Sequence, residues 1–274
     1  MNDGLVSIKK ITKKVLPSPL LQILRRALGK DDPSRYASLP RYKGRSETVL
    51  QCCISYNRHG GYCVPLSSLH RPATQKILSG RVWEPKTIEF ITSHCGSGDV
   101  IHAGTYFGDF VPALSRKCSP HAKIWAFEPH PESHQCALIT IALNSLRNVE
   151  LINAGLGSQQ SSMSLVVADQ AGQSFGGGSK LAESEDDFVG QAIEVKILRI
   201  DDVIPPDRNV SIIQLDVEGF EQQALEGAIA TIKRCKPILI LESLPHEDWL
   251  SANLLPIGYK ITGKIHANSI LSIS

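Results

Sequence analysis

From residue 98 onward, short apolar runs alternate with longer stretches of helical periodicity, and this alternation limits the possible folds more than any other feature. A strand that leads through a helix into another strand is typical of a parallel sheet with helices on both faces. The chain is therefore predicted to have an α/β fold. The predicted strands are Asp99–His102, Lys123–Phe127, Val149–Asn153, Ser211–Leu215 and Pro237–Glu242, and the predicted helices are Phe110–Lys117, Glu132–Leu146 and Phe220–Arg234.

A glycine-rich, acidic stretch, Gly172–Gly190, separates two further predicted strands, Ser162–Ala168 and Ala192–Ile200. Glycine and acidic residues favour turns and contact with water. We therefore expect this stretch to be a mobile, solvent-exposed loop.

The first 30 residues form a basic segment attached to a mildly acidic body. They contain seven Lys and Arg and one acidic residue, whereas the whole chain has a net charge of +2. Apolar residues recur there at helical spacing and are interrupted by Pro17 and Pro19, which predicts two short amphipathic helices. Two interpretations stay open: weak peripheral contact with the inner membrane through residues 1–30, and packing on the domain or in an oligomer. We favour packing.

Composition excludes several classes of protein. No apolar stretch is long enough to span a bilayer. Seven cysteines without a CxxC pair favour a reduced, cytoplasmic compartment, and the uneven charge does not suit a nucleic-acid partner. No metal site is expected, because the His and Cys residues near the N-terminal side of the main domain have no standard zinc spacing. These residues are Cys52, Cys53, His59, Cys63 and His70.

The segment GDVIHAGTYFGDF carries a predicted strand through a glycine-containing turn into a helix. Gly104 and Gly108 allow a sharp turn and the close approach of a ligand to the start of the helix. The spacing is not GxGxxG, so the fingerprint of dinucleotide enzymes is incomplete. Glu128 ends the next strand, where a carboxylate can accept hydrogen bonds from a ribose. Together these strand ends predict an adenosine site.

A third segment, Ile212–Glu221, ends a buried strand with three carboxylates, Asp216, Glu218 and Glu221. Like charges at a strand end are costly unless a cation or a proton transfer is involved. A cationic sulfonium meets this condition and a nicotinamide cofactor does not. Capping of the following helix explains Glu221 in part, but it does not explain Asp216.

In sequence and order, these segments resemble the FkbM-type family of S-adenosylmethionine-dependent methyltransferases over about residues 95–245. The matching pieces are GDVIHAGTYFGDF, AFEPHPESH, LNSLRNVELINAGLG, RIDDVI, QLDVEGFEQQALEGA and PILILES. The resemblance implies a Rossmann-like class I methyltransferase fold with a mostly parallel seven-stranded sheet whose last strand is antiparallel. Tyr259–Thr262 and Ser269–Ile273 would supply the final hairpin.

The resemblance also implies an organisation and a cofactor site. Residues 1–48 are predicted to be the basic helical segment and a linker, 49–94 a lead-in that covers the acceptor site, and 95–274 the methyltransferase domain. The cofactor is predicted to be S-adenosyl-L-methionine. The residues predicted to bind it are His102, Gly104, Thr105, Tyr106, Gly108, Asp109, Glu128, Pro129, Asn153 and Asp216.

Two positions depart from the family pattern. His102 stands where the family usually has Asp, and a neutral imidazole lacks the attraction of an anion for the cofactor's ammonium group. Gln214 stands where Lys is common. The first departure affects the expected affinity for the cofactor.

Methyl transfer to an alcohol requires a protein to align the acceptor oxygen and to remove its proton. Asp216 is the first candidate for this base, because it is expected at a strand tip that faces the methyl group. Glu218 and Glu242 are alternatives. His59, His70 and His246 also stay open, because the lead-in is expected to cover the acceptor pocket.

Three functions follow. The leading one is an O-methyltransferase that acts on a sugar hydroxyl of a glycolipid, oligosaccharide or secondary metabolite, such as the 2-hydroxyl of fucose on a lipochitooligosaccharide nodulation signal. The second is an NAD-dependent Rossmann oxidoreductase, which the missing middle glycine disfavours. The third is a non-catalytic, membrane-associated adaptor on a methyltransferase scaffold.

Overall fold

The computed structural model describes residues 49–182 and 190–273, which belong to one compact unit spanning 44–274. The predicted basic helices and linker, 1–48, lie outside the described residues, as do residues 183–189 of the predicted loop. Among the described residues, no helix is long and apolar enough to cross a membrane.

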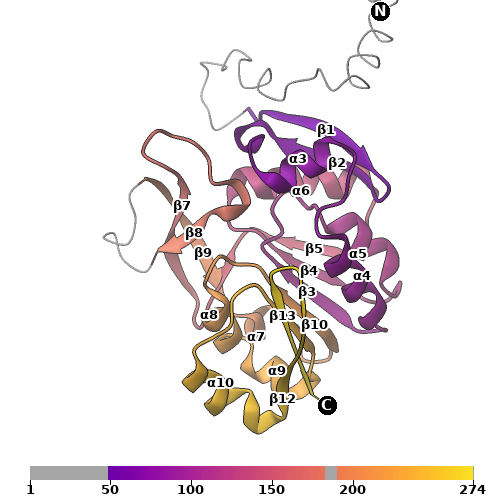
Figure 1. Cartoon of the computed structure of the whole chain (residues 1–274), viewed down its shortest axis with the longest axis vertical. Helices are drawn as coiled ribbons and strands as arrows, with labels where there is room; N and C mark the ends of the chain where they lie inside the picture. The colour runs from indigo at the N-terminus through magenta and orange to yellow at the C-terminus, as the bar shows by residue number, and fades with distance from the viewer. Residues whose placement is uncertain (1–48, 183–189, 274) are drawn as a thin grey trace, which may run out of the picture. The chain divides into compact units, whose positions relative to one another are not determined.

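A seven-stranded sheet forms the centre of the unit, in the order β12-β13-β11-β10-β3-β4-β5 (Figure 1). Neighbouring strands from β5 to β11 are parallel, and β13 is antiparallel to both β11 and β12. The α/β class and the mostly parallel sheet with an antiparallel last strand are confirmed. The strands are β3 (Asp99–Ala103), β4 (Ile124–Phe127), β5 (Val149–Ile152), β10 (Val210–Leu215), β11 (Ile238–Leu241), β12 (Tyr259–Ile265) and β13 (Asn268–Ile273).

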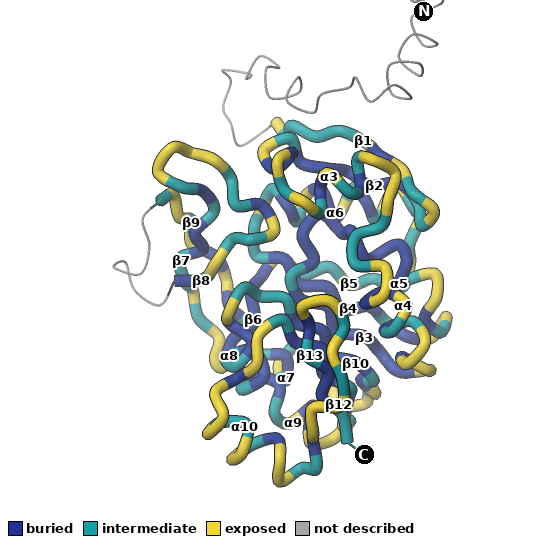
Figure 2. The backbone as a smooth tube through the Cα atoms, in the orientation of Figure 1, coloured by how far each residue is buried: buried dark blue, intermediate teal, exposed yellow. Residues whose placement is uncertain are grey.

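Helices cover both faces of this sheet because alternate residues of its central strands point to opposite sides. Val100 of β3 packs with Leu114 of α5 on one face, whereas Ile101 lies in the second core with Leu225 of α8. Figure 2 shows the central strands as the buried part of the molecule. The helices are α3 (Pro72–Leu78), α4 (Pro85–His94), α5 (Val111–Lys117), α6 (Pro131–Leu143), α7 (Ile200–Val203), α8 (Glu221–Glu226), α9 (Ile229–Cys235) and α10 (Glu247–Asn253).

The single helix predicted over Phe220–Arg234 is wrong, because the structure divides this stretch into α8 and α9. A Cβ at Gly227 would lie 2.0 Å from the carbonyl oxygen of Gly157, so the chain packs too closely there for another residue. The side chain of Asp201 then accepts hydrogen bonds from the backbone N–H groups of Ala230 (3.0 Å) and Thr231 (2.8 Å). These bonds satisfy the free donors of a new helix start.

A second, four-stranded sheet, β6-β9-β7-β8, stands beside the first (Figure 1). The two predicted strands β7 and β9 are its longest members, and part of the predicted exposed loop belongs to it. Gly176–Gly178 form a short 3₁₀ turn, η4, and β8 pairs with β7, so this part of the loop is folded against the protein. The strands of this second sheet are β6 (Gly155–Leu156), β7 (Ser161–Ala168), β8 (Lys180–Ala182) and β9 (Gln191–Leu198).

The lead-in begins with an antiparallel hairpin, β1 (Cys52–Asn57) and β2 (Gly60–Pro65), followed by α3 and α4. The hairpin is attached to α6: the Cys63 N–H donates to Thr140 Oγ1 at 3.0 Å, and the Gly61 N–H donates to Asn144 Oδ1 at 3.1 Å. Tyr62 packs in the same core as Phe107 of the glycine-containing turn. The lead-in is therefore part of the wall around that turn.

Candidate functional site

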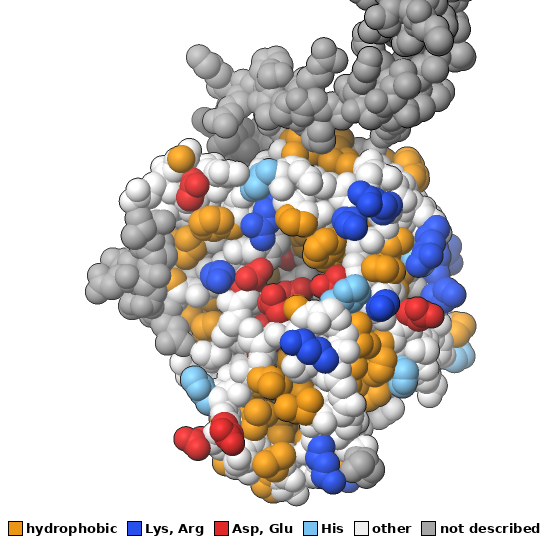
Figure 3. Space-filling view, viewed as in Figure 1, with side chains coloured by type: hydrophobic (Ala, Val, Ile, Leu, Met, Phe, Trp, Pro, Cys, Tyr) orange, Lys and Arg blue, Asp and Glu red, His pale blue; other side chains and the backbone are white. Residues whose placement is uncertain are grey.

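A cleft opens at the carboxyl ends of β3, β4 and β10, where parallel α/β sheets bind their ligands. Three carboxylates line it, those of Glu128, Asp216 and Glu218, and none of the described residues lining it is Lys, Arg or His. Figure 3 shows acidic side chains gathered in a hollow on this face, with Lys and Arg around it. The opposite wall is apolar and includes Leu156, Leu165 and Leu181.

Gly104 allows the first strand end to approach β10. Its φ is +82°, and a Cβ there would lie 1.9 Å from the carbonyl oxygen of Asp216. Any other residue would push these two strand ends apart. The N–H of Asp216 donates to the carbonyl oxygen of Ala103 at 3.1 Å and fixes the approach.

Glu128 follows β4 and is 6% exposed. Its Oε2 accepts a hydrogen bond from the Tyr106 N–H at 2.6 Å, and its Oε1 accepts one from the His130 N–H at 2.9 Å. Burial raises the pKa of Glu128 to about 8. Because each carboxylate oxygen can accept two hydrogen bonds, each keeps one acceptor position for a ligand hydroxyl. The predicted ribose contact thus has a fixed and available carboxylate.

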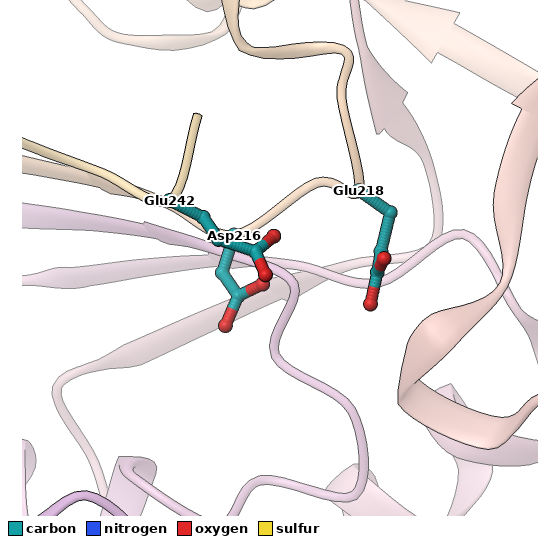
Figure 4. Close-up of side chains that lie close together, drawn as sticks. All are labelled: Asp216, Glu218 and Glu242. Atoms are coloured by element: carbon teal, nitrogen blue, oxygen red, sulfur yellow. The ribbon is translucent and has the colours of Figure 1, made fainter. Parts of the chain in front are cut away.

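Asp216, Glu218 and Glu242 form a cluster, which we call the carboxylate cluster, with oxygen atoms within 4.8 Å of one another (Figure 4). Asp216 follows β10 and Glu242 follows the neighbouring β11, so parallel pairing brings them together. Glu218, with φ +55°, lies on the loop after Asp216. Burial, followed by the Glu242 carboxylate, raises the pKa of Asp216 well above its usual value. The cluster therefore favours a cation or a shared proton.

The remaining acid of the predicted segment, Glu221, has a structural role. It is 1% exposed and lies in the first turn of α8. Its Oε1 accepts a hydrogen bond from the Val217 N–H at 3.1 Å. This contact agrees with the predicted capping role.

His102 is buried within β3 and is absent from the cleft lining. Its Nδ1 is hydrogen-bonded to Oε1 of Gln214, its neighbour on β10, and its ring stacks on Phe110 with centroids 5.2 Å apart. Burial lowers the pKa of His102 to about 4, so the imidazole is neutral. The two positions that depart from the family pattern are thus bonded to each other.

The other predicted cofactor residues divide into two groups. Pro129 lines the cleft, whereas Thr105, Tyr106, Gly108, Asp109 and Asn153 do not. The Asn153 amide donates to the carbonyl oxygens of Glu128 (2.8 Å) and Pro129 (3.0 Å), and the Thr105 hydroxyl donates to the His102 carbonyl at 3.0 Å. These side chains hold the strand ends in place.

Asp109 is 6% exposed. Burial, followed by the Glu84 carboxylate, raises its pKa to about 7. Three further candidates for the base, the side chains of His59, His70 and His246, belong neither to the cleft lining nor to the carboxylate cluster. Of the candidate bases among the described residues, Asp216 and Glu218 line the cleft, and Glu242 lies next to them in the carboxylate cluster.

Sequence reasoning missed the wall formed by the second sheet. Leu165 of β7, Leu181 of β8 and Ser179 between η4 and β8 line the cleft. Leucine and serine carry no chemical signature, and the pairing of β7 with β8 depends on contacts that the sequence pattern does not specify. Ala154 and Gly155 also line the cleft, and they lie in a stretch that carried the family resemblance.

The family model for the methyltransferase FkbM domain matches residues 102–255. This range begins within β3, at His102, and includes β4, β5, β10 and β11 of the central sheet. It ends before the final hairpin, β12 and β13. The chain belongs to the FkbM methyltransferase family. The membership confirms the resemblance and the predicted cofactor, S-adenosylmethionine.

Individual relatives of this FkbM family member are distant. Methyltransferase sdnD of Sordaria araneosa is 27% identical in an alignment of 172 positions, which covers 51% of this chain and 66% of that protein, just under two thirds. A crystal structure of methyltransferase FkbM from Methylobacillus flagellatus KT has a TM-score of 0.45 at 15% identity and covers 99% of this chain and 59% of that one. The M. jannaschii TYW2 complex with AdoMet has a TM-score of 0.44 at 11% identity, over 84% of this chain and 85% of that one.

The residues of this FkbM domain fit S-adenosylmethionine. The cofactor carries a sulfonium and an ammonium group, and the cleft presents three carboxylates without a lining cation. The apolar wall suits an adenine ring, and Glu128 suits a ribose. A nicotinamide dinucleotide would instead place its pyrophosphate among these carboxylates, where like charges repel. The cleft and the family both disfavour the oxidoreductase alternative.

Proposed function

We propose that this protein is an S-adenosylmethionine-dependent O-methyltransferase that acts on a sugar hydroxyl of a glycolipid, oligosaccharide or secondary metabolite. The 2-hydroxyl of a deoxysugar, such as fucose on a lipochitooligosaccharide signal, is the specific candidate. The cofactor supplies an electrophilic methyl group on a sulfonium. The protein's share is to hold the acceptor oxygen in line and to take its proton.

The observation that carries this proposal is the carboxylate cluster beside the cleft. An alcohol is a weak nucleophile until a base removes its proton, and a base is typically worth about 10²- to 10⁴-fold in rate. Asp216 is the proposed base, because it lines the cleft and belongs to the carboxylate cluster. The burial that raises its pKa makes its ionised form a stronger proton acceptor. Glu242 and Glu218 are the alternatives.

Further aspects of the proposal concern the surroundings of the site. We propose a glycan or small-molecule acceptor and no nucleic-acid partner, since the cleft is acidic. The lead-in, residues 49–94, is proposed to cover the acceptor. A cytoplasmic location, with weak contact of residues 1–30 with the inner membrane as an alternative, also stays a proposal.

Transfer of a labelled methyl group from S-adenosylmethionine to a panel of glycans tests the function. We expect incorporation into at least one hydroxyl acceptor, with mass spectrometry and NMR placing the methyl on oxygen. Methylation of nitrogen or carbon acceptors alone would contradict the O-methyltransferase assignment. Absence of transfer to every acceptor, with S-adenosylmethionine still bound, would favour the adaptor on a methyltransferase scaffold.

Two controls sharpen this assay. Calorimetric titration with NAD should show no binding where S-adenosylmethionine binds. Addition of EDTA should leave the rate unchanged, because we propose that the carboxylate cluster acts as a base without a metal ion. A rate lost in EDTA and restored by a divalent cation would replace the base with a metal site at the same three residues.

A further inference from the structure

The rim of the cleft carries an arginine that makes no side-chain hydrogen bond or close ion pair in the part of the chain that the structure describes, although its charge opposes the rise that burial causes in the pKa of Glu218. Arg71 precedes α3 in the lead-in and is half-buried. Within residues 49–182 and 190–273, its guanidinium makes no side-chain hydrogen bond and no ion pair within 4.0 Å. A guanidinium offers five donors in a planar fork that matches carboxylate and phosphate groups.

Two glycines, Gly176 and Gly178, leave room for the Arg71 side chain beside the carboxylate cluster. A Cβ at Gly178 would lie 2.5 Å from Nη2 of Arg71 and 3.4 Å from Oε1 of Glu218. A Cβ at Gly176 would lie 3.3 Å from Cγ of Arg71. The absence of a side chain at Gly178 therefore lets the fork of Arg71 and the carboxylate of Glu218 both lie close to this backbone position.

A second cation lies on the same rim. Nζ of Lys180 is 3.9 Å from Oε2 of Glu218, and its side chain is 64% exposed. Such an exposed pair contributes little to stability. Neither Lys180 nor Arg71 lines the cleft that fits the cofactor, although Glu218 does. The two cations therefore stand outside the residues that line the cleft, and both lie near Glu218 of the carboxylate cluster.

We propose that Arg71, assisted by Lys180, binds an anionic group of the acceptor, a carboxylate or a phosphate, while the acceptor hydroxyl lies at the carboxylate cluster. The inference rests on the proposed function and narrows its substrate to acidic sugars, such as uronic acids or sugar phosphates, in place of a neutral fucose. Neutralisation of Glu218 alone does not account for Arg71, because it leaves the five donors of the fork unused. An anion opposite the fork would use them.

Titration of the full chain with inorganic phosphate at constant ionic strength tests the anion site directly. We expect phosphate to bind the wild type and to bind Arg71→Gln about tenfold more weakly or worse. Arg71→Lys should retain part of the affinity. Lys260→Gln, an equal charge change at an exposed residue of β12, should retain all of it. Equal phosphate affinity of the wild type and Arg71→Gln would overturn the proposal.

Gly178→Ala tests the position of the Arg71 guanidinium separately from its charge, because Arg71 itself is unchanged in this variant. The added methyl group must displace Nη2, so phosphate binding should weaken although Arg71 is still present. Thermal unfolding checks that both variants are folded. If Gly178→Ala binds phosphate as the wild type does, the placement of the fork by η4 is contradicted.

Two further measurements assign the anion to the acceptor. S-adenosylmethionine should bind Arg71→Gln as it binds the wild type; a tenfold loss would assign the guanidinium to the cofactor's carboxylate and overturn the proposal. In the glycan assay, acidic acceptors should exceed matched neutral ones, such as methyl glucuronide against methyl glucoside, and equal transfer to both would also overturn it. If no hydroxyl is methylated at all, the proposed function fails, and the phosphate titration still decides on the anion site.

Discussion

The two edges of the central sheet hold buried carboxylates under opposite conditions. At the amino edge, Asp99 is 1% exposed and is surrounded by donors. It accepts hydrogen bonds from Arg208 Nε, from Trp125 Nε1 and from the Lys123 N–H, each at 2.8 Å. Every strong acceptor of this carboxylate is matched, so burial of its charge is compensated.

At the carboxyl edge, three acids crowd together with little compensation. The oxygen atoms of Asp216, Glu218 and Glu242 lie within 4.8 Å of one another, and among the described residues the ion pair that reaches them is Lys180–Glu218 at 3.9 Å. Such an arrangement costs stability, and it occurs at sites that bind or move charge. The comparison teaches that the same residue type stabilises the fold at one edge and serves a ligand at the other.

The largest effect on stability is expected at Asp99, where hydrogen-bond donors compensate the buried charge. Asp99→Asn removes the negative partner of Arg208 and leaves buried donors without a charged acceptor. We expect the free energy of unfolding to fall by about 3 kcal/mol, at the lower end for buried pairs because Arg208 is 29% exposed. Denaturant unfolding measures this loss. Affinity for S-adenosylmethionine in the remaining folded protein should stay unchanged, and a parallel loss of affinity would contradict the separation of the two edges.

Asp216→Asn should lower turnover and raise stability, the opposite of what is expected for Asp99→Asn. An amide cannot accept the hydroxyl proton, so turnover should fall by about 10²-fold or more. The folded-state pKa of Asp216 lies above its unfolded value, so this group lowers stability at any pH above the unfolded pKa, and its removal should raise the unfolding midpoint at neutral pH.

Turnover, cofactor affinity and the unfolding midpoint are measured on the same Asp216→Asn protein. If affinity falls together with turnover, Asp216 helps to hold the sulfonium region. If turnover is unchanged, both roles are excluded and Glu218 and Glu242 become the candidates.

These two edges also show how far sequence reasoning reaches. The strand–helix alternation predicted the five parallel strands, because buried strands are short apolar runs between glycine or polar boundaries. The final hairpin was instead implied by the family resemblance. Strand order then placed Gly104, Glu128 and Asp216 at one edge, since the carboxyl ends of parallel strands meet there. Residues whose chemistry and strand position agree were therefore predictable.

Other features depend on tertiary contacts that no local pattern records. The break between α8 and α9 arises because Gly227 packs on Gly157, which is distant in sequence. The second sheet requires β7 to pair with a strand inside a stretch that is rich in glycine. Arg71 lies in the lead-in, where no motif marks it. The fold alone brings its side chain close to Glu218, beside Gly178.

A smaller effect is expected at Glu128, which is buried like Asp99 but accepts two backbone N–H groups in place of a cation. Glu128→Gln replaces a charged acceptor of the ribose with a neutral one. Hydrogen bonds to charged groups contribute about 1.5–3 kcal/mol each, so affinity for S-adenosylmethionine should fall about 10- to 100-fold. Calorimetry measures this fall. Glu150→Gln, on the exposed ion pair of β5, is the matched control and should bind normally. Unchanged affinity in folded Glu128→Gln would remove it from the ribose site.

The smallest effect concerns the pH dependence of cofactor binding to the wild type. Burial raises the pKa of Glu128 to about 8, so this carboxyl is largely protonated in the free protein at neutral pH. The ribose hydroxyls and the positive charges of S-adenosylmethionine favour the ionised form, and binding should therefore release a proton below the pKa. Affinity should rise with pH, by less than about tenfold per pH unit, and level off above about pH 8.

Titrations in two buffers of different ionisation enthalpy measure the released proton directly. Glu128→Gln should reduce both the proton release and the slope of affinity against pH. Any proton release that remains in this variant is assigned to the carboxylate cluster, because burial also raises the pKa of Asp216. Asp99 does not contact the cleft, so folded Asp99→Asn should keep the wild-type slope. An affinity that is constant or falls as pH rises would show that protonated Glu128 binds the ribose, with its hydroxyl donating to a ribose oxygen.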